Sequence, residues 1–274
     1  MSTDKPTGVD TYNAAIERIE TVADGLSIFF IRPDTPIPGR LPGHYVSIGL
    51  VGPDGKKLIR RPYSLSQSLG PAADPDLLEL LIIRVPEGDL TPILFDQNEG
   101  DRLFVRPKMV GTYLLPKLDA DMTLILTSTG TGVAPHMTML ETCVDTCKQV
   151  VMMECVRYSA ELAYAEQIRQ FQQTHPNLVY ISLVTREGGA KRYIQDYFRD
   201  GILEKEHGVS IAPETTHVFA CGNPAMIGIP KEGRKTGALS YDTPGGLVEM
   251  LTTRYGLTIH KPRQPGQTHF EKYW

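Results

Sequence analysis

Short apolar runs separated by turn residues dominate the first 118 residues. The runs at 14–20 and 26–31 are separated by Asp24-Gly25, a pair typical of a tight hairpin. Further strand-like runs lie at 43–50, 77–85 and 100–105. Many short strands with Gly/Pro turns and no clear helix predict a small antiparallel β-barrel, with the run at 100–105 as its closing strand.

The pattern changes near residues 116–121. Beyond this point apolar strands alternate with helical stretches, the strands at 123–126, 150–156, 178–184 and 217–220 and the helices at 137–146, 160–173, 193–198 and 247–254. This alternation is typical of a parallel sheet with crossover helices. We therefore predict two domains, an antiparallel β-barrel at 1–118 and an α/β parallel-sheet domain at 119–274.

Composition narrows the class of protein. The 274 residues are 41% apolar and 22% charged, with a net charge of −4. No apolar run reaches the roughly 18 residues of a membrane span, so we expect no such span. The mild acidity gives no electrostatic case for binding nucleic acid. Residues 1–6 lack a basic and apolar leader, which predicts a cytoplasmic protein without an export signal.

The four cysteines are Cys143, Cys147, Cys155 and Cys221, and none forms a C-x-x-C pair. Their spacing argues against a built-in iron–sulfur cluster and against structural zinc. We expect no metal, and reduced thiols are the simplest account of these residues.

Arg61-Pro62-Tyr63-Ser64 follows a predicted strand. In an extended segment Arg61 and Tyr63 project to one side, and Ser64 adds a hydrogen-bonding hydroxyl. A guanidinium beside an aromatic ring suits a ligand with a phosphate at one end and a flat ring at the other. An ordinary edge strand with an exposed Arg and a half-buried Tyr is the alternative.

Two further stretches lie at the ends of predicted parallel strands. Gly130-Thr131-Gly132 links a strand to a helix, where backbone can approach a pyrophosphate. A tight turn that needs Gly for positive φ is the alternative. Cys221 ends a later strand at the carboxyl edge of the sheet, where α/β sheets bind ligands, although a lone Cys there is more often a buried small hydrophobe.

A short helix is predicted after residue 90, with Thr91 as its cap and Pro92 at its first position. Its start in the mouth of a barrel would offer backbone N–H groups to an anion. A plain capped helix with no ligand is an equal alternative.

Five motifs together resemble one family. They are Arg61-Pro62-Tyr63-Ser64, the stretch 85–92 (VPEGDLTP), the stretch 130–135 (GTGVAP), the stretch 221–224 (CGNP) and the terminal Tyr273-Trp274. In this order and spacing the chain is similar to the ferredoxin–NADP⁺ reductase superfamily, and within it to the bacterial ferredoxin/flavodoxin–NADP⁺ reductases. The resemblance covers nearly the whole chain and implies an FAD-binding barrel followed by an NADP-binding α/β domain.

The resemblance also implies roles on the FAD side. Arg61 would contact the FAD pyrophosphate, Tyr63 would stack on the isoalloxazine, and Ser64 would hydrogen-bond near the flavin N5 where hydride arrives. The ribityl and phosphate region would be lined by Leu81, Ile82, Ile83 and Arg84, with Asp89, Leu90 and Thr91 on the phosphates. Tyr273 would cover the flavin ring face opposite Tyr63 and Trp274 would stack on the adenine, with the assignment of these two rings left open.

On the NADP side, Thr131 would lie at the junction of flavin and nicotinamide, with Cys221 beside the nicotinamide. Thr129, Gly130, Gly132 and Gly222 would also bind the NADP, with the glycine-rich turn approaching its pyrophosphate. An NADP site must pair a 2′-phosphate, and by resemblance its clamp is Arg157, Arg186 and Arg192. Solvated surface arginines are the alternative, and Glu187 beside Arg186 could neutralise the patch.

The function implied is transfer of electrons from NADPH through FAD to ferredoxin or flavodoxin. Because such carriers are acidic, a basic rim is expected, with candidates Lys56, Lys57, Arg60, Lys231, Arg234 and Lys235. The segment 227–246 departs from the family pattern, and its Gly/Pro content predicts a loop. Two alternatives stay open: an NADH-dependent reductase feeding an oxygenase or other acceptor, and a flavin-binding regulatory subunit without turnover.

Overall fold

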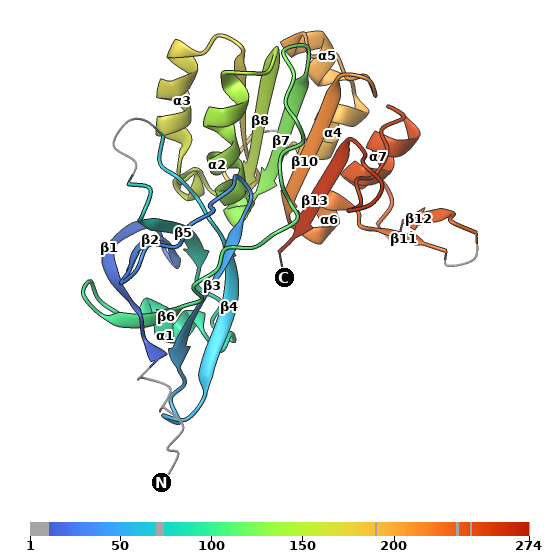
Figure 1. Cartoon of the computed structure of the whole chain (residues 1–274). Coiled ribbons are helices and arrows are strands. Elements are labelled where there is room, and N and C mark those ends of the chain that lie inside the picture. Colours follow the sequence, from blue (N-terminus) through green and yellow to red (C-terminus); the bar gives the residue numbers. More distant parts are fainter. Residues whose placement is uncertain (1–10, 70–73, 190, 234–235, 242, 274) are drawn as a thin grey trace. The chain divides into compact units, whose positions relative to one another are not determined.

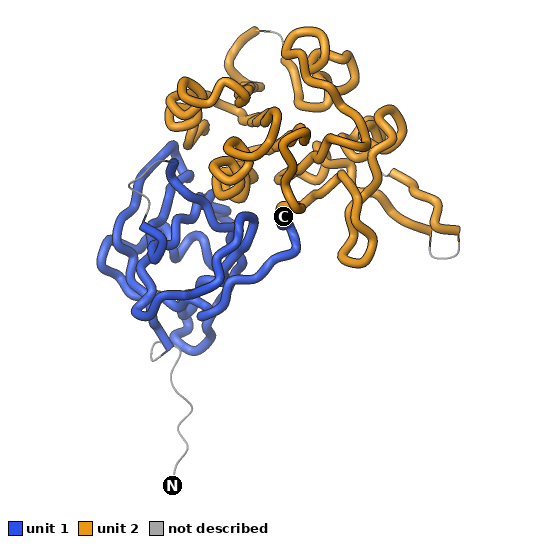
Figure 2. The backbone as a smooth tube through the Cα atoms, turned by 45° about the horizontal axis from the view of Figure 1, so that its top comes forward, with its two compact units in different colours: residues 1–114 blue, residues 115–274 orange. Residues whose placement is uncertain are grey.

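The computed structural model describes residues 11–69, 74–189, 191–233, 236–241 and 243–273. The chain divides into two compact units, residues 1–114 and 115–274 (Figure 2). Each unit has its own sheet and its own apolar core.

Unit 1 is built on one antiparallel sheet of six strands (Figure 1). The strands are β1 (Ala14–Ala23), β2 (Leu26–Pro33), β3 (Tyr45–Val51), β4 (Leu58–Ser64), β5 (Leu78–Ile83) and β6 (Arg102–Val105). Their order is β4-β3-β6-β1-β2-β5. The β1–β2 hairpin turns at Gly25, whose φ of 67° suits a residue without a Cβ. The predicted antiparallel, barrel-like fold is confirmed.

The closure of this sheet differs from the prediction. β6 lies between β3 and β1 in the middle of the strand order, so it joins the two halves of the sheet. The two edge strands meet instead through a bridge between Ser66, just after β4, and Glu79 on β5. The Ser66 N–H donates to the Glu79 carbonyl at 2.8 Å. Position along the chain therefore does not reveal which strand closes the sheet.

The short helix α1 (Thr91–Phe95) is present, but Thr91 does not cap it. The N-cap residue is Leu90, and no side chain caps this helix. The Thr91 hydroxyl instead accepts the Val85 N–H at 2.9 Å and donates to the Val85 carbonyl at 3.1 Å. This pairing uses the hydroxyl to hold the 85–91 turn closed, which is why the predicted cap is wrong.

Unit 2 contains a parallel five-stranded sheet in the order β13-β10-β7-β8-β9. The strands are β7 (Thr123–Thr129), β8 (Gln149–Val156), β9 (Leu178–Val184), β10 (Thr216–Gly222) and β13 (Thr268–Lys272). The helices are α2 (Val133–Val144), α3 (Ala165–Thr174), α4 (Ile194–Arg199), α5 (Ile202–His207), α6 (Pro224–Ile227) and α7 (Leu247–Thr253), with single turns η2 (Gly130–Gly132) and η3 (Ser159–Glu161). The predicted α/β parallel sheet is confirmed.

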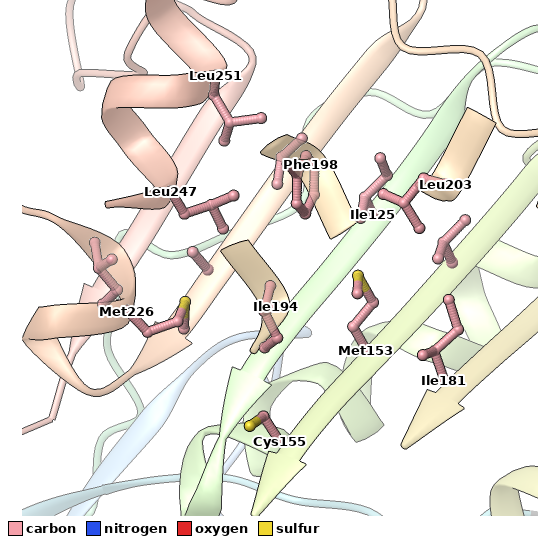
Figure 3. Packing of buried hydrophobic residues seen from close by; sticks show 14 of the residues in the cluster. Ile125, Met153, Cys155, Ile181, Ile194, Phe198, Leu203, Met226, Leu247 and Leu251 are labelled. Atoms are coloured by element: carbon pink, nitrogen blue, oxygen red, sulfur yellow. The ribbon is translucent and has the colours of Figure 1, made fainter. Parts of the chain in front are cut away.

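The core of unit 2 lies between the sheet and α4 to α7, and Figure 3 shows the side chains that meet there. Ile125 and Met153 come from the strands, and Phe198, Leu203 and Leu247 come from the helices. Full burial of such a side chain contributes roughly 1.5–3 kcal/mol. Figure 1 shows α2 and α3 in front of the same sheet, so the strands are covered on both faces. This explains their nearly continuous apolar runs.

The described part of the segment 227–246 contains more regular structure than predicted. It contains a small antiparallel ladder between β11 (Pro230–Glu232) and β12 (Leu239–Tyr241). Lys261 forms an ion pair with Glu232 of this ladder. The prediction of a plain loop is therefore wrong in part, because Pro230–Glu232 and Leu239–Tyr241 pair with each other through three residue pairs.

Candidate functional site

In unit 1 the Arg61-Pro62-Tyr63-Ser64 motif forms the end of β4. The register with β3 places Arg61 opposite Ile48 and Tyr63 opposite Val46. The Arg61 guanidinium donates to the Arg60 carbonyl at 2.9 Å and to the Asp89 carboxylate at 2.5 Å. Two predicted site residues that are 28 positions apart in the chain are therefore brought together at one exposed place on the barrel.

Tyr63 and Ser64 are more enclosed than Arg61. The Tyr63 ring is half-buried and packs against the barrel core, and this burial raises the pKa of its hydroxyl to about 12. Tyr63 is thus neutral at physiological pH and offers an aromatic surface. Ser64 is buried with 8% of its surface exposed. The pair suits a flat ring better than a charged group.

The predicted FAD-contact residues on β5 and α1 differ in what they can offer. Ile82 and Leu90 point into the barrel core, so only their backbone is available to a ligand. Leu81 is also buried and Ile83 is half-buried, whereas Arg84 and Asp89 are exposed. Arg84 lies 3.7 Å from Asp96.

In unit 2 the glycine-rich turn follows β7 and packs against the end of the neighbouring strand β10. Gly130 has a φ of 53°, which is the tight-turn use of Gly. Gly132 serves a different purpose, because a Cβ there would lie 2.3 Å from the Cys221 carbonyl oxygen. At Gly222, φ is 125° and a Cβ would lie 2.2 Å from the Thr129 hydroxyl. Thr129 accepts the Asn223 N–H at 2.7 Å. The turn and the 221–223 segment are therefore locked together by backbone contact.

Cys221 is fully buried at the carboxyl end of β10. Burial raises the pKa of its thiol well above the usual range, the Glu271 carboxylate adds to this, and a hydrogen bond with Tyr273 opposes it. The thiol therefore stays protonated and is unsuited to nucleophilic attack. Tyr273 follows the edge strand β13 and donates its N–H to the Gly222 carbonyl at 2.9 Å. Trp274 lies outside the described residues.

The predicted phosphate clamp begins where β8 and β9 end. The Arg186 N–H donates to the Arg157 carbonyl at 2.8 Å, so the backbones of these two arginines meet just beyond the ends of the strands. The Arg157 guanidinium binds the Glu161 carboxylate at 2.6 and 2.9 Å. Arg192 is exposed just before α4. Sequence reasoning missed Glu161, although its position four residues after Arg157 is a recognisable ion-pair spacing.

Ser159 is a second residue that sequence reasoning missed. Its N–H and its hydroxyl both donate to one oxygen of Glu187, at 2.7 and 3.1 Å. Tyr158 and Tyr193, next to two of the arginines in sequence, are 43% and 42% exposed. Exposed aromatic side chains beside cations are a useful signal for recognition of an aromatic base.

Glu154 is a third missed residue, on β8 in register with Ser128 and Ser182. It is fully buried and accepts the Tyr180 hydroxyl at 2.8 Å. Burial raises the pKa of this carboxyl to about 7, against smaller opposing contributions from Tyr180 and Arg169. Its other oxygen has no hydrogen-bond partner among the described residues.

Comparison with known proteins places the chain among its relatives. Residues 126–232 match the family model of the oxidoreductase NAD-binding domain. A ferredoxin–NADP reductase of Pseudomonas aeruginosa is 32% identical over 78% of this chain and 86% of its own length. The chain belongs to the ferredoxin–NADP reductase family. A flavodoxin/ferredoxin–NADP reductase of Escherichia coli is 28% identical over 80% of this chain and 87% of its own length.

Solved structures agree on the architecture of this reductase. A ferredoxin NADP⁺ reductase from Neisseria gonorrhoeae, with bound FAD and NADP, matches with a TM-score of 0.76. It is 20% identical and the match covers 96% of this chain and 99% of that one. The predicted two-part fold is thereby confirmed, and the sequence relatives above confirm the predicted family and its oxidoreductase class.

Four of the six residues predicted to form a basic rim lie within the described part of the chain. Lys56 and Lys57 are exposed in the turn before β4, and Arg60 lies over the Phe104 ring at 5.7 Å. Lys231 is exposed on β11, whereas Arg234 and Lys235 lie outside the described residues.

The described residues of the reductase contain neither a membrane-spanning helix nor a metal-binding cluster. Among these residues no helix combines the length and the apolar character needed to cross a membrane. In the same part of the chain no three His, Cys, Asp or Glu side chains are grouped so that they could hold a metal ion.

Proposed function

We propose that this chain is an FAD-dependent oxidoreductase that carries electrons between NADPH and ferredoxin or flavodoxin. Membership of the ferredoxin–NADP reductase family supports this proposal. The observation that carries the choice of NADPH is the backbone hydrogen bond between Arg157 and Arg186, which brings the two residues together just beyond the ends of two parallel strands. Two guanidinium groups at this edge of the sheet suit a phosphate dianion.

The residues of unit 1 fit FAD. Arg61 is 48% exposed and presents a planar donor group that a pyrophosphate can engage in place of Asp89. Tyr63 supplies the stacking surface and Ser64 the hydrogen bond at the ring edge. When bound, FAD supplies the conversion between a two-electron donor and one-electron acceptors. The protein residues bind and orient it.

The residues of unit 2 fit the nicotinamide half of NADPH. The turn at Thr129–Gly132 offers backbone to the pyrophosphate, because Gly130 has no side chain to block its approach, and Gly132 allows the turn to pack against the Cys221 carbonyl. Cys221 is a protonated thiol, so we assign it to positioning the nicotinamide rather than to covalent chemistry. The Tyr273 N–H, bonded to the Gly222 carbonyl, fixes the residue that follows this thiol.

A specific observation also favours the second candidate, an NADH-dependent reductase of the same architecture. Two carboxylates already accept hydrogen bonds at this edge of the sheet. Glu161 accepts from Arg157, and Glu187 accepts from Ser159. Carboxylates at this position are typical of sites that bind unphosphorylated ribose. The arginines favour NADPH and the carboxylates favour NADH, so the two candidates differ in a measurable preference.

The test begins with the absorption spectrum of the purified protein and its reconstitution with FAD. Anaerobic addition of NADPH and then of ferredoxin or flavodoxin follows electron transfer through the flavin band. Replacement of Arg186 and Arg192 by Ala should lower kcat/KM for NADPH by tenfold or more, about 1.4 kcal/mol, and leave NADH almost unchanged. Equal losses for both nucleotides would contradict a 2′-phosphate clamp, and a protein that cannot hold FAD would contradict the whole assignment.

A further inference from the structure

Ser159 carries two donors that point at one carboxylate oxygen. The N–H and the hydroxyl of Ser159 meet Glu187 Oε1 at 2.7 and 3.1 Å. One oxygen of a phosphate could accept the same two hydrogen bonds. Ser159 lies two residues after Arg157, whose carbonyl accepts the Arg186 N–H. These donors therefore belong to the same edge of the sheet as the arginine pair.

The Glu187 carboxylate reaches Ser159 through a local turn of the chain. Glu187 follows β9, and Gly188 and Gly189 come directly after it with φ of 59° and 76°. A Cβ on either glycine would meet nothing within 4 Å, so these glycines serve backbone conformation and not close packing. Glu187 itself is exposed. An incoming anion can therefore replace it without disturbing a packed core.

Glu161 is a carboxylate of a different kind. Its two oxygens accept from the Arg157 N–H, the Tyr158 N–H and the Arg157 guanidinium, and its side chain is only 13% exposed. Burial alone would raise the pKa of Glu161, but the hydrogen bonds from Arg157 hold it below the usual value. Glu161 thus stays ionised and fixes Arg157, whereas Glu187 binds through one oxygen.

We propose that Glu187 is a specificity-determining residue that occupies the 2′-phosphate position at Ser159 and must be displaced when NADPH binds. The inference rests on the proposed nucleotide site and deepens it. NADH carries no 2′-phosphate and leaves the Glu187–Ser159 contact intact. Glu187 therefore lowers the preference for NADPH that the arginines create, and sets how far the two nucleotides are distinguished.

The test measures binding rather than turnover. Isothermal titration of the FAD-loaded protein compares adenosine 2′,5′-bisphosphate with adenosine 5′-monophosphate, which differ only in the 2′-phosphate. Glu187→Gln should tighten the bisphosphate by about three- to tenfold, as expected for removal of a like charge a few ångströms away at a protein surface. Glu187→Ala should do the same, and neither should change the monophosphate. Glu206→Gln removes one exposed charge from α5 and should change neither ligand.

Each outcome decides something. Tighter bisphosphate binding in both Glu187 variants supports the inference, including the case where the wild type shows no preference and the variants acquire one. Unchanged or weaker bisphosphate binding overturns it, because Glu187 then supports the site or has no role. If neither the wild type nor the variants prefer the bisphosphate, the 2′-phosphate site fails together with the inference. If the wild type prefers it and the variants do not improve, only the inference fails.

Discussion

Two regions at the same edge of the unit 2 sheet are built by opposite means. The first, the turn region, is the contact between Gly132, Thr129 and the 221–222 segment, where backbone atoms meet with no room for a Cβ. The second, the charge region, is the set of Arg157, Glu161 and the Ser159–Glu187 contact after β8 and β9, in which Arg157 and Glu187 are exposed and Glu161 is largely buried. One depends on shape and the other on charge.

This difference separates what each region can change. Close-packed backbone has no alternative arrangement, so a substitution in the turn region must disturb stability and ligand binding together. Exposed ion pairs contribute little to stability, so the charge region can alter which nucleotide is preferred while the fold stays unchanged. Substitutions in the two regions should therefore differ in their effect on the free energy of unfolding.

The largest effect is expected for Gly132→Ala. The added Cβ would lie 2.3 Å from the Cys221 carbonyl oxygen, so β7 and β10 must separate. We expect a loss of about 3 kcal/mol or more in the free energy of unfolding, with loss of nucleotide binding. Urea unfolding and titration with adenosine 2′,5′-bisphosphate measure the two quantities.

Gly130→Ala is the matched control for this prediction. Gly130 has a φ of 53° but open space around a Cβ, so only backbone strain is added. That strain costs about 1–2 kcal/mol. Equal destabilisation by the two substitutions would show that conformation, not close approach, decides both glycines.

The second prediction concerns Glu154, buried on β8 at the level of Ser128. Its carboxyl pKa is about 7 in the folded protein, raised by burial from a reference value of 4.5. Because the folded value is the higher one, this group favours the folded state below pH 4.5, and that stability is lost as the pH rises through 7. The gap corresponds to about 3 kcal/mol.

Glu154→Gln removes this ionisation and keeps an acceptor for Tyr180. The variant should therefore be more stable than the wild type by about 3 kcal/mol at pH 8, and the difference should become small at pH 5. Urea unfolding at both pH values gives the comparison, and other titrating groups cancel in the difference. A stability gap that does not depend on pH would mean that Glu154 is already uncharged at pH 8 or is solvated.

The turn region is largely predictable from the sequence, whereas in the charge region the sequence indicates Arg157 and Glu187 but not their partners Glu161 and Ser159. Glycines between a predicted strand and a predicted helix are typical of a tight turn or of close backbone approach, so the sequence predicts a turn at 130–132. The sequence left open which use each glycine had, and only the structure separates the positive φ of Gly130 from the close approach at Gly132. Arg157 and Arg186 were located through the ends of two strands.

The residues that sequence reasoning missed depend on contacts between distant parts of the chain. Glu187 is indicated by its place beside Arg186, but its partner Ser159 lies 28 positions away and no spacing rule connects the two. Tyr180 meets Glu154 only because β8 and β9 pair in one register. Thr91 was read as a helix cap, but the Val85 backbone competes for its hydroxyl. Patterns local in the sequence predict helices and strands, whereas the packing of distant segments determines which side chains form hydrogen bonds with each other.

A smaller effect is expected for Tyr273→Phe, at the border of the turn region. The substitution removes the hydroxyl that hydrogen-bonds the buried Cys221 thiol and keeps the ring. Loss of one such bond costs about 1 kcal/mol. Thermal unfolding should therefore show a modest decrease, and Cys221 should stay unreactive toward a thiol reagent because it remains buried. Rapid labelling of Cys221 in the variant would instead indicate that Tyr273 shields it.

The smallest effect on stability is expected for Arg157→Ala, in the charge region. The Arg157 side chain is 49% exposed, and an ion pair of this kind contributes less than about 1 kcal/mol. The same substitution should raise KM for NADPH about tenfold, since a charged partner of the 2′-phosphate is lost. Urea unfolding and steady-state kinetics with both nucleotides test the two parts separately. If unfolding changed as much as for Gly132→Ala, the charge region would be a structural support, and the contrast between the two regions would disappear.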